Sequence, residues 1–357
     1  PSVRGGGAMS QTLLVYGAYG YTGRLVMADA RARGVDVMVA GRNAERAREV
    51  AEAFDAPYRV FGLDEPVEVD AGLEGMAAVA HCAGPFSRTA VPMADGCLRN
   101  GVHYLDITGE IEVFEALAAM DVRAKDAGIM IMPGTGFDVV PSDCLAAHLK
   151  REMPSATHLV LAIASSGRPS HGTATTIVEN LHRGGFVRRE GRLTPVPGCY
   201  RVREIDYGGG KRMPAMTIPW GDVATAWRST GIPNIEVYMA APAGLRWFAW
   251  SSRVFGPVLG SGPVQRFLKG RIDAAPAGPS DDARARGWCR LYGEVRNAQG
   301  DQFCATMKTP DGYTLTSAAT VHIAQKVLAG EAPVGYQTPS TAYGADLVLE
   351  LDGVERS

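Results

Sequence analysis

The sequence predicts an α/β protein with a doubly wound parallel sheet, followed by a second domain with a different pattern. A glycine-rich turn at 17–23 separates an apolar run from a helical segment, and apolar runs then alternate with helical segments up to about residue 141. After residue 143 this alternation ends. Strands that alternate with helices imply right-handed crossovers and a parallel sheet with helices on both faces.

Short apolar runs give the expected strands of this sheet, at 12–16, 35–40, 58–61, 77–82, 104–107 and 129–132. Helices are expected between them, at 23–33, 44–54, 67–73, 91–100 and 111–127. Ligands bind such sheets beyond the carboxyl ends of the strands. The residues that follow each strand are therefore the candidates for a functional site.

The first of these turns, Gly17-Ala18-Tyr19-Gly20-Tyr21-Thr22-Gly23, has the composition of a phosphate-binding loop. Its glycines allow a tight bend and a close approach to a pyrophosphate, which the N–H groups and positive end of the next helix then hold. We predict a dinucleotide site built by Gly17, Tyr19, Gly20, Tyr21, Thr22 and Gly23.

The second strand ends in Gly41-Arg42-Asn43. A site that prefers NAD usually carries Asp or Glu here for the ribose 2′-hydroxyl, whereas an arginine suits a 2′-phosphate. These three residues therefore predict NADP(H) in preference to NAD(H). A solvated Arg42 without a ligand is the alternative.

Composition limits the functional classes. The 357 residues have room for two or three domains, and 46% hydrophobic and 21% charged residues are typical of a globular enzyme. A net charge of −2 gives no reason to expect nucleic acid, and no apolar run is long enough for a membrane span. Residues 1–8 precede Met9 and are interpreted as an expression remnant, with no signal peptide after it.

The six cysteines are scattered and lack metal-ligand spacing, which predicts no metal site and reduced thiols in a cytoplasmic protein. In the second half, a strand at 156–165, a loop at 167–172 and a helix at 173–181 precede short strands, which predicts an antiparallel sheet with inserted helices. A hairpin of 287–295 with 302–309 and a helix at 316–329 follow. The aromatic segment 245–272 is interpreted as core or a dimer interface, with a lipid-facing surface or a substrate channel as alternatives.

Several motifs resemble the saccharopine dehydrogenase-like oxidoreductases, and most closely their trans-acting enoyl reductase branch. The glycine loop and Ala40-Gly41-Arg42-Asn43 contribute, but the more specific motifs are Ala83-Gly84-Pro85-Phe86, Tyr104-Leu105-Asp106-Ile107-Thr108-Gly109-Glu110 and Pro133-Gly134-Thr135-Gly136-Phe137-Asp138. The resemblance implies a Rossmann domain at 9–143, an inserted α+β domain at 144–310, a C-terminal segment at 311–357 that returns to the first domain, and a nicotinamide cofactor. It does not fix the substrate.

Hydride transfer requires a placed nicotinamide and a group that handles a proton. The turn Ala83-Gly84-Pro85-Phe86 is expected beside the ribose and nicotinamide. Asp106, Asp138 and His171 are the candidate catalytic residues, and a site shared by the two aspartates would raise one pKa. Glu110 is expected to contact a cofactor ribose. Helix capping is the alternative role for either aspartate.

The predicted function is NADP(H)-dependent reduction of a C=C, C=O or C=N bond in a small molecule. An apolar substrate is favoured, because the second domain is rich in aromatic residues and shows no clustered arginines for a dicarboxylate. One alternative is a saccharopine-type amino-acid imine or amine, its carboxylate held by Arg188 or Arg201. The other is a non-catalytic NADP-binding sensor. A homodimer is expected.

Overall fold

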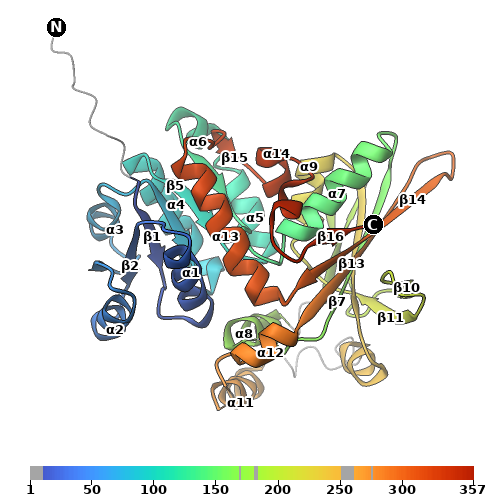
Figure 1. Ribbon diagram of the computed structural model, residues 1–357. Coiled ribbons are helices and arrows are strands. Elements are labelled where there is room, and N and C mark those ends of the chain that lie inside the picture. Colours follow the sequence, from blue (N-terminus) through green and yellow to red (C-terminus); the bar gives the residue numbers. More distant parts are fainter. Residues whose placement is uncertain (1–10, 169, 181–183, 251–260, 275) are drawn as a thin grey trace, which may run out of the picture.

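The computed structural model describes residues 11–168, 170–180, 184–250, 261–274 and 276–357, and contains two sheets that lie side by side (Figure 1). Sheet A is parallel, in the order β15-β6-β5-β4-β1-β2-β3. Its strands are β1 (Leu13–Tyr16), β2 (Val37–Gly41), β3 (Tyr58–Val60), β4 (Ala78–His81), β5 (His103–Asp106), β6 (Met130–Met132) and β15 (Gly335–Tyr336). The prediction of a doubly wound parallel sheet is confirmed.

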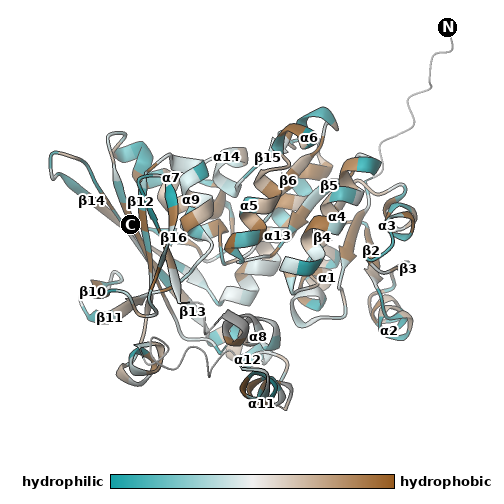
Figure 2. Ribbon diagram, turned by 180° about the vertical axis from the view of Figure 1, so that it is seen from behind, coloured by the Kyte–Doolittle hydropathy of each residue, from teal (hydrophilic) through white to brown (hydrophobic). Residues whose placement is uncertain are grey.

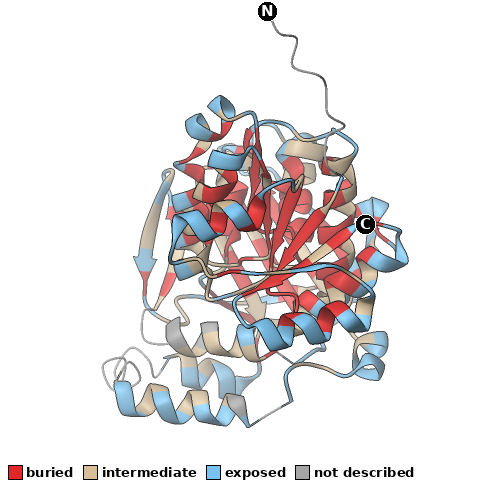
Figure 3. Ribbon diagram, turned by 90° about the vertical axis from the view of Figure 1, so that its left-hand side faces the viewer, coloured by how far each residue is buried: buried red, intermediate tan, exposed pale blue. Residues whose placement is uncertain are grey.

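Helices cover both faces of sheet A, so β1 and β4 at its centre are buried along their whole length (Figure 3). The helices of the first domain are α1 (Tyr21–Ala32), α2 (Ala44–Phe54), α3 (Pro66–Leu73), α4 (Phe86–Asn100), α5 (Ile111–Ala118) and α6 (Asp121–Asp126). The last two replace the single helix that was expected at 111–127. The sequence also gave no indication of α7 (Val140–Glu152), which connects the two sheets.

Sheet B has the order β10-β11-β12-β7-β13-β14-β16, with β8 and β9 attached at β12. Its strands are β7 (His158–Ser165), β8 (Gly185–Arg189), β9 (Arg192–Val196), β10 (Val202–Asp206), β11 (Arg212–Thr217), β12 (Asn234–Ala240), β13 (Trp288–Arg296), β14 (Gln302–Pro310) and β16 (Glu355–Arg356). The hairpin of β13 and β14 is confirmed. The antiparallel prediction is wrong at the centre of the sheet, where β7 and β12 run parallel.

The C-terminal segment joins both sheets. The helix α13 (Gly312–Leu328) packs on α1, and β15 then pairs with β6 at one edge of sheet A. The short helices α14 (Pro339–Tyr343) and η1 (Leu347–Glu350) pack on α7, and β16 pairs with β14 in sheet B (Figure 1). Apolar residues are concentrated in the strands of sheet A and along α13 (Figure 2). One continuous core therefore runs from Leu13 and Val15 of β1 to Leu291 of β13.

Three helices, α8 (His171–Asn180), α11 (Gly262–Asp273) and α12 (Asp281–Arg286), lie together beside the two sheets (Figure 1). Residues 243–250 are also helical, and α9 (Asp222–Thr230) packs on α7. Of the aromatic segment, residues 251–260 lie outside the described residues. Trp247 and Phe267 are exposed, so the prediction that they belong to the core is wrong, whereas an interface stays a prediction. No described helix is long and apolar enough to cross a membrane.

Candidate functional site

The glycine loop joins β1 to α1, and two of its glycines are required by the backbone. Gly17 has φ +81°, and a Cβ there would lie 2.8 Å from the Cβ of Ala83 at the end of β4. A Cβ at Gly23 would lie 2.4 Å from the carbonyl oxygen of Gly17. The loop can therefore pack against both β4 and α1 only while these positions carry no side chain.

Gly20 differs from these two glycines, because its φ of −71° suits any residue and an added Cβ would meet only the Gly17 carbonyl oxygen, at 3.2 Å. No side chain caps the first turn of α1, which begins at Tyr21. The N–H groups and positive end of this helix are therefore placed to bind an anion. This arrangement fits a cofactor pyrophosphate lying over Gly20, Tyr21 and Thr22.

The end of β2 forms the second part of the predicted cofactor site. A Cβ at Gly41 would lie 2.4 Å from the ring of Tyr19, so the ring can pack against the end of β2 only because residue 41 has no side chain. Arg42 is exposed. Asn43 caps α2 by accepting a hydrogen bond from the backbone N–H of Arg46 (2.9 Å), and the Arg46 guanidinium lies 4.9 Å from the centre of the Tyr19 ring. Sequence reasoning missed Arg46, although it stands only four positions after Arg42.

The turn Ala83-Gly84-Pro85-Phe86 follows β4 and leads into α4. The carboxylate of Glu110 accepts hydrogen bonds from the backbone N–H groups of Phe86 (3.0 Å) and Ser87 (2.9 Å). Glu110 thus fixes this turn to the loop after β5, in addition to lining a cavity described below. Its predicted contact with a cofactor ribose stays a prediction.

Asp106 ends β5 and is completely buried. Its carboxylate accepts hydrogen bonds from the Tyr104 hydroxyl (2.7 Å) and from the backbone N–H groups of Thr108 and Gly134 (2.9 Å each). Burial raises the pKa of Asp106 to about 6, against the opposing effect of these hydrogen bonds. This geometry favours a structural role, in which Asp106 ties β5 to the loop after β6, over the predicted catalytic one.

A cavity of about 630 Å³ lies between the first domain and sheet B, and we call it the interdomain cavity. Thr22 of the glycine loop, the turn 84–86, Glu110, Asp138 and His171 all line it. The structure therefore brings two of the three predicted catalytic residues to the predicted nicotinamide turn. The third, Asp106, is not among the lining residues.

Asp138 is half-buried, and burial raises its pKa to about 6. Its Oδ2 lies so close to Gly109 that a Cβ there would be 2.7 Å away. The Trp220 indole N–H donates to the Asp138 carbonyl oxygen (2.9 Å), which holds this loop against sheet B. Burial raises the pKa of each aspartate, and the two carboxylates differ in that only Asp138 lines the cavity, so a site shared by Asp106 and Asp138 stays a prediction.

The wall of the interdomain cavity opposite the glycine loop is apolar. It is formed mainly by Met216, Ile218, Trp220, Met239, Leu245 and Phe248. Among the described residues that line the cavity there is no arginine or lysine. Arg188 and Arg201, proposed above as carboxylate ligands, line a different cavity. None of the six cysteines forms a disulfide, and the described residues contain no cluster of potential metal ligands.

Tyr21 connects the glycine loop to the helices beside it, which the sequence did not indicate. Its hydroxyl donates to the Pro279 carbonyl oxygen (2.6 Å) and accepts from Arg284 of α12 (3.1 Å). The segment that contains Pro279 also contacts His171: the carbonyl oxygen of Ala277 accepts a hydrogen bond from the backbone N–H of His171 (3.0 Å). The segment 277–280 therefore links the predicted phosphate loop to a residue of the interdomain cavity.

Comparison with known protein families decides what the first domain is. Residues 13–132 match the family model of the saccharopine dehydrogenase NADP binding domain. The first domain is therefore similar to saccharopine dehydrogenase NADP-binding domains. The match confirms both the predicted resemblance and the predicted preference for NADP(H), and it includes the glycine loop, Arg42 and the turn after β4.

Curated relatives carry two kinds of name. The trans-acting enoyl reductase of Mycobacterium ulcerans is 29% identical over 187 residues, which is 47% of this chain and 44% of that protein. The saccharopine dehydrogenase-like oxidoreductase of Pongo abelii is 26% identical over 161 residues, covering 40% of this chain and 38% of that protein. The matched regions thus span less than half the length of these relatives.

Solved structures extend the likeness to the whole fold. Saccharopine dehydrogenase (L-Glu forming) from Saccharomyces cerevisiae superposes with a TM-score of 0.68 over 97% of this chain and all of that chain, at 11% identity. Homospermidine synthase from Legionella pneumophila, solved in complex with NAD, has a TM-score of 0.64 over 97% and 91% of the two chains, at 9% identity. At these identities the likeness establishes the two-domain fold alone.

Proposed function

We propose that the protein is an NADP(H)-dependent oxidoreductase that reduces a C=C, C=O or C=N bond of an apolar substrate in the interdomain cavity. The observation that carries the proposal is the cavity itself, which has the glycine loop and the turn 84–86 on one side and an apolar wall on the other. When bound, NADPH supplies the hydride. A sensor would have no need of an open cavity beside the nicotinamide turn.

The lining of the cavity favours an apolar substrate over an amino-acid derivative. Carboxylates that are removed from water need a cation or several hydrogen-bond donors. The described lining offers the side chains of Met216, Met239 and Phe248 in place of a guanidinium or an ammonium group. An acyl or other hydrocarbon chain gains free energy on such a surface, at about 25 cal/mol for each Å² that it buries.

Asp138 and His171 are the proposed proton-handling residues, because both line the cavity at the predicted nicotinamide turn. With a pKa of about 6, the Asp138 carboxyl keeps its proton to a higher pH than an ordinary aspartate, and so can donate it to a substrate atom that becomes basic on reduction. Glu110 acts indirectly, since it holds Phe86 and Ser87 in position.

The test is NADPH oxidation with matched substrates: an α,β-unsaturated acyl thioester, a long-chain ketone, and an imine formed from an amino acid. We expect turnover of an apolar substrate, and a fall of about 10²-fold or more in kcat for Asp138→Asn. The exposed Asp126→Asn serves as the control. Met239→Arg should abolish turnover while NADPH still binds. Turnover of the amino-acid imine alone, or of none of these substrates by a protein that binds NADPH, would refute the proposal.

A further inference from the structure

A second cavity, of about 810 Å³, lies on the other face of sheet B. Along β12, Glu236 and Tyr238 line this second cavity whereas Met239 lines the interdomain one, as expected for alternate residues of a strand. The two cavities share no described lining residue. We call the second one the arginine cavity, after its lining residues Arg188, Arg189, Arg201, Arg203 and Arg296.

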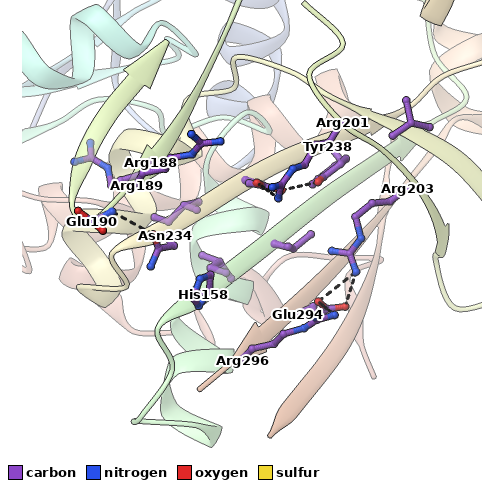
Figure 4. A pocket seen from close by; sticks show the side chains of 15 residues that line it. His158, Arg188, Arg189, Glu190, Arg201, Arg203, Asn234, Tyr238, Glu294 and Arg296 are labelled. Atoms are coloured by element: carbon purple, nitrogen blue, oxygen red, sulfur yellow. Dashed lines mark hydrogen bonds and ion pairs between the residues drawn. The ribbon is translucent and has the colours of Figure 1, made fainter. Parts of the chain in front are cut away.

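The arginine cavity has a floor and two sides rather than being an open sheet face. Strands β7, β12 and β13 form its floor, and β8 carries Arg189 along one side (Figure 4). On another side β10 lies over the sheet. Two contacts hold it there: Arg203 pairs with Glu294 of β13 (3.0 Å), and the Tyr207 hydroxyl donates to the Ile163 carbonyl oxygen of β7 (3.4 Å). Val160 and Tyr238 supply a partly apolar floor between the charged side chains.

On one side of the arginine cavity, two guanidinium groups share one carboxylate. Glu294 is almost completely buried and lies 3.0 Å from both Arg203 and Arg296. The Tyr292 hydroxyl also donates to it, at 2.9 Å. One positive charge at this position is therefore not balanced by a carboxylate.

A second unbalanced charge lies near Tyr200. Two arginines lie over the Tyr200 ring, because the guanidinium groups of Arg189 and Arg201 are 5.3 and 5.2 Å from its centre. Arg201 forms an ion pair with Glu236 (2.6 Å), whereas Arg189 donates to the Tyr200 hydroxyl and pairs with no carboxylate of the described chain. The four arginines share the cavity with three glutamates: Glu236 and Glu294 form ion pairs with them, whereas Glu190 forms no ion pair within the described residues.

The fifth arginine does not add to this binding capacity. The Arg188 guanidinium donates to the carbonyl oxygens of Val223 (2.6 Å) and Gly191 (2.7 Å) and to the Glu115 carboxylate (3.0 Å). Its donors are used within the protein, which makes it a structural residue. The groups able to meet a ligand are those at Arg203 and Arg296 and those at Arg189 and Arg201 (Figure 4).

We propose that the arginine cavity binds a small organic molecule with two anionic groups, each a carboxylate or a phosphate, separated by a short carbon skeleton. One group binds at Arg203 and Arg296 and the other at Arg189 and Arg201, while the skeleton lies on Val160 and Tyr238. Guanidinium groups bind carboxylates and phosphates through paired hydrogen bonds, so the class includes dicarboxylates and sugar bisphosphates. This site is independent of the proposed hydride transfer, because it lies on the opposite face of sheet B.

The experiment is isothermal titration calorimetry of the full chain at low salt, with succinate and glutarate as dicarboxylate probes, fructose 1,6-bisphosphate as the bisphosphate probe and butyrate as the monoanion. We expect a probe with two anionic groups to bind at least about tenfold more tightly than butyrate. Arg296→Gln and Arg189→Gln should each weaken its binding by about tenfold or more. Arg296 is the variant of choice because Arg203 and Tyr292 still hold Glu294. Arg290→Gln on the same strand, outside the cavity, is the control and should change nothing.

Comparing the probes distinguishes a dicarboxylate ligand from a bisphosphate ligand. A cavity that binds a dicarboxylate would favour succinate or glutarate over fructose 1,6-bisphosphate. The proposal is overturned if butyrate binds as tightly as the probes with two anionic groups, or if no probe binds at millimolar concentration. It is also overturned if Arg296→Gln binds the probes as tightly as the control Arg290→Gln. A dimer in sedimentation that Arg296→Gln and Arg189→Gln dissociate without any probe bound would overturn it as well, because this face would then be an interface between copies. NADPH titration of each variant checks the fold separately.

Discussion

Replacing Arg42 by alanine tests the part of the cofactor site that distinguishes NADP(H) from NAD(H). Arg42 is exposed at the end of β2, and Arg46 lies one helical turn further along the chain, held over the Tyr19 ring. A hydrogen bond to a charged group contributes about 1.5–3 kcal/mol, and exposure of Arg42 to solvent places it at the low end. We therefore expect the Kd for NADPH to rise about tenfold in Arg42→Ala, because 1.4 kcal/mol is a factor of ten.

The assay is a fluorescence titration with NADPH and, separately, with NADH, whose ribose has no 2′-phosphate. The Kd for NADH should change by less than about twofold, and the loss for NADPH should shrink at high salt as exposed charges are screened. Arg46→Ala should behave like Arg42→Ala. Arg48→Ala, whose side chain is 59% exposed and pairs with Glu52 at 3.8 Å, is the matched control. Equal losses for both cofactors would refute the 2′-phosphate role.

Three further predictions concern the loop, the buried acids and the link between the domains. Gly23→Ala should lower both Tm and the affinity for NADPH, because its Cβ would lie 2.4 Å from a backbone oxygen. Gly20→Ala should weaken NADPH binding and leave Tm unchanged. If calorimetry and titration show the same pattern for both variants, this prediction is contradicted. Asp222 is fully buried, and burial raises its pKa well above the usual value. Stability therefore falls as pH rises above about 4, where this aspartate ionises in the unfolded chain, so Asp222→Asn should raise Tm at pH 8 and not at pH 4. Tyr21→Phe removes the hydrogen bond to Pro279 and should increase hydrogen exchange in 277–280 without abolishing NADPH binding, and unchanged exchange would argue against the link.

Local patterns were sufficient to predict the first domain. The glycine loop, the strand that precedes it and the helix that follows it are contiguous in the sequence, so spacing alone indicates their arrangement. Helix α7 was missed because the glycines at 134 and 136 and Pro141 suggest an extended turn. In the structure Pro141 lies in the first turn of the helix, where a missing N–H costs nothing.

The candidate site depends on contacts that no local pattern contains. Asp106 ends one strand of sheet A and Asp138 follows the next. Only tertiary packing buries Asp106 among three hydrogen-bond donors and opens Asp138 to the interdomain cavity. The apolar wall combines Met216, Met239 and Phe248 from separate elements. The parallel pairing of β7 with β12 joins segments that are far apart in the chain, which residue alternation within either strand cannot indicate.

The place of the C-terminal segment has a consequence for synthesis on the ribosome. Sheet A receives its last strand, β15, only from Gly335 and Tyr336, and sheet B receives β16 only from Glu355 and Arg356. The edges of both sheets are therefore complete only after residues 335–336 and 355–356 have emerged, although most of the strands emerge much earlier. A nascent chain held before residue 335 should expose the β6 edge and attract chaperones, and release of the remaining residues should close both sheets almost together.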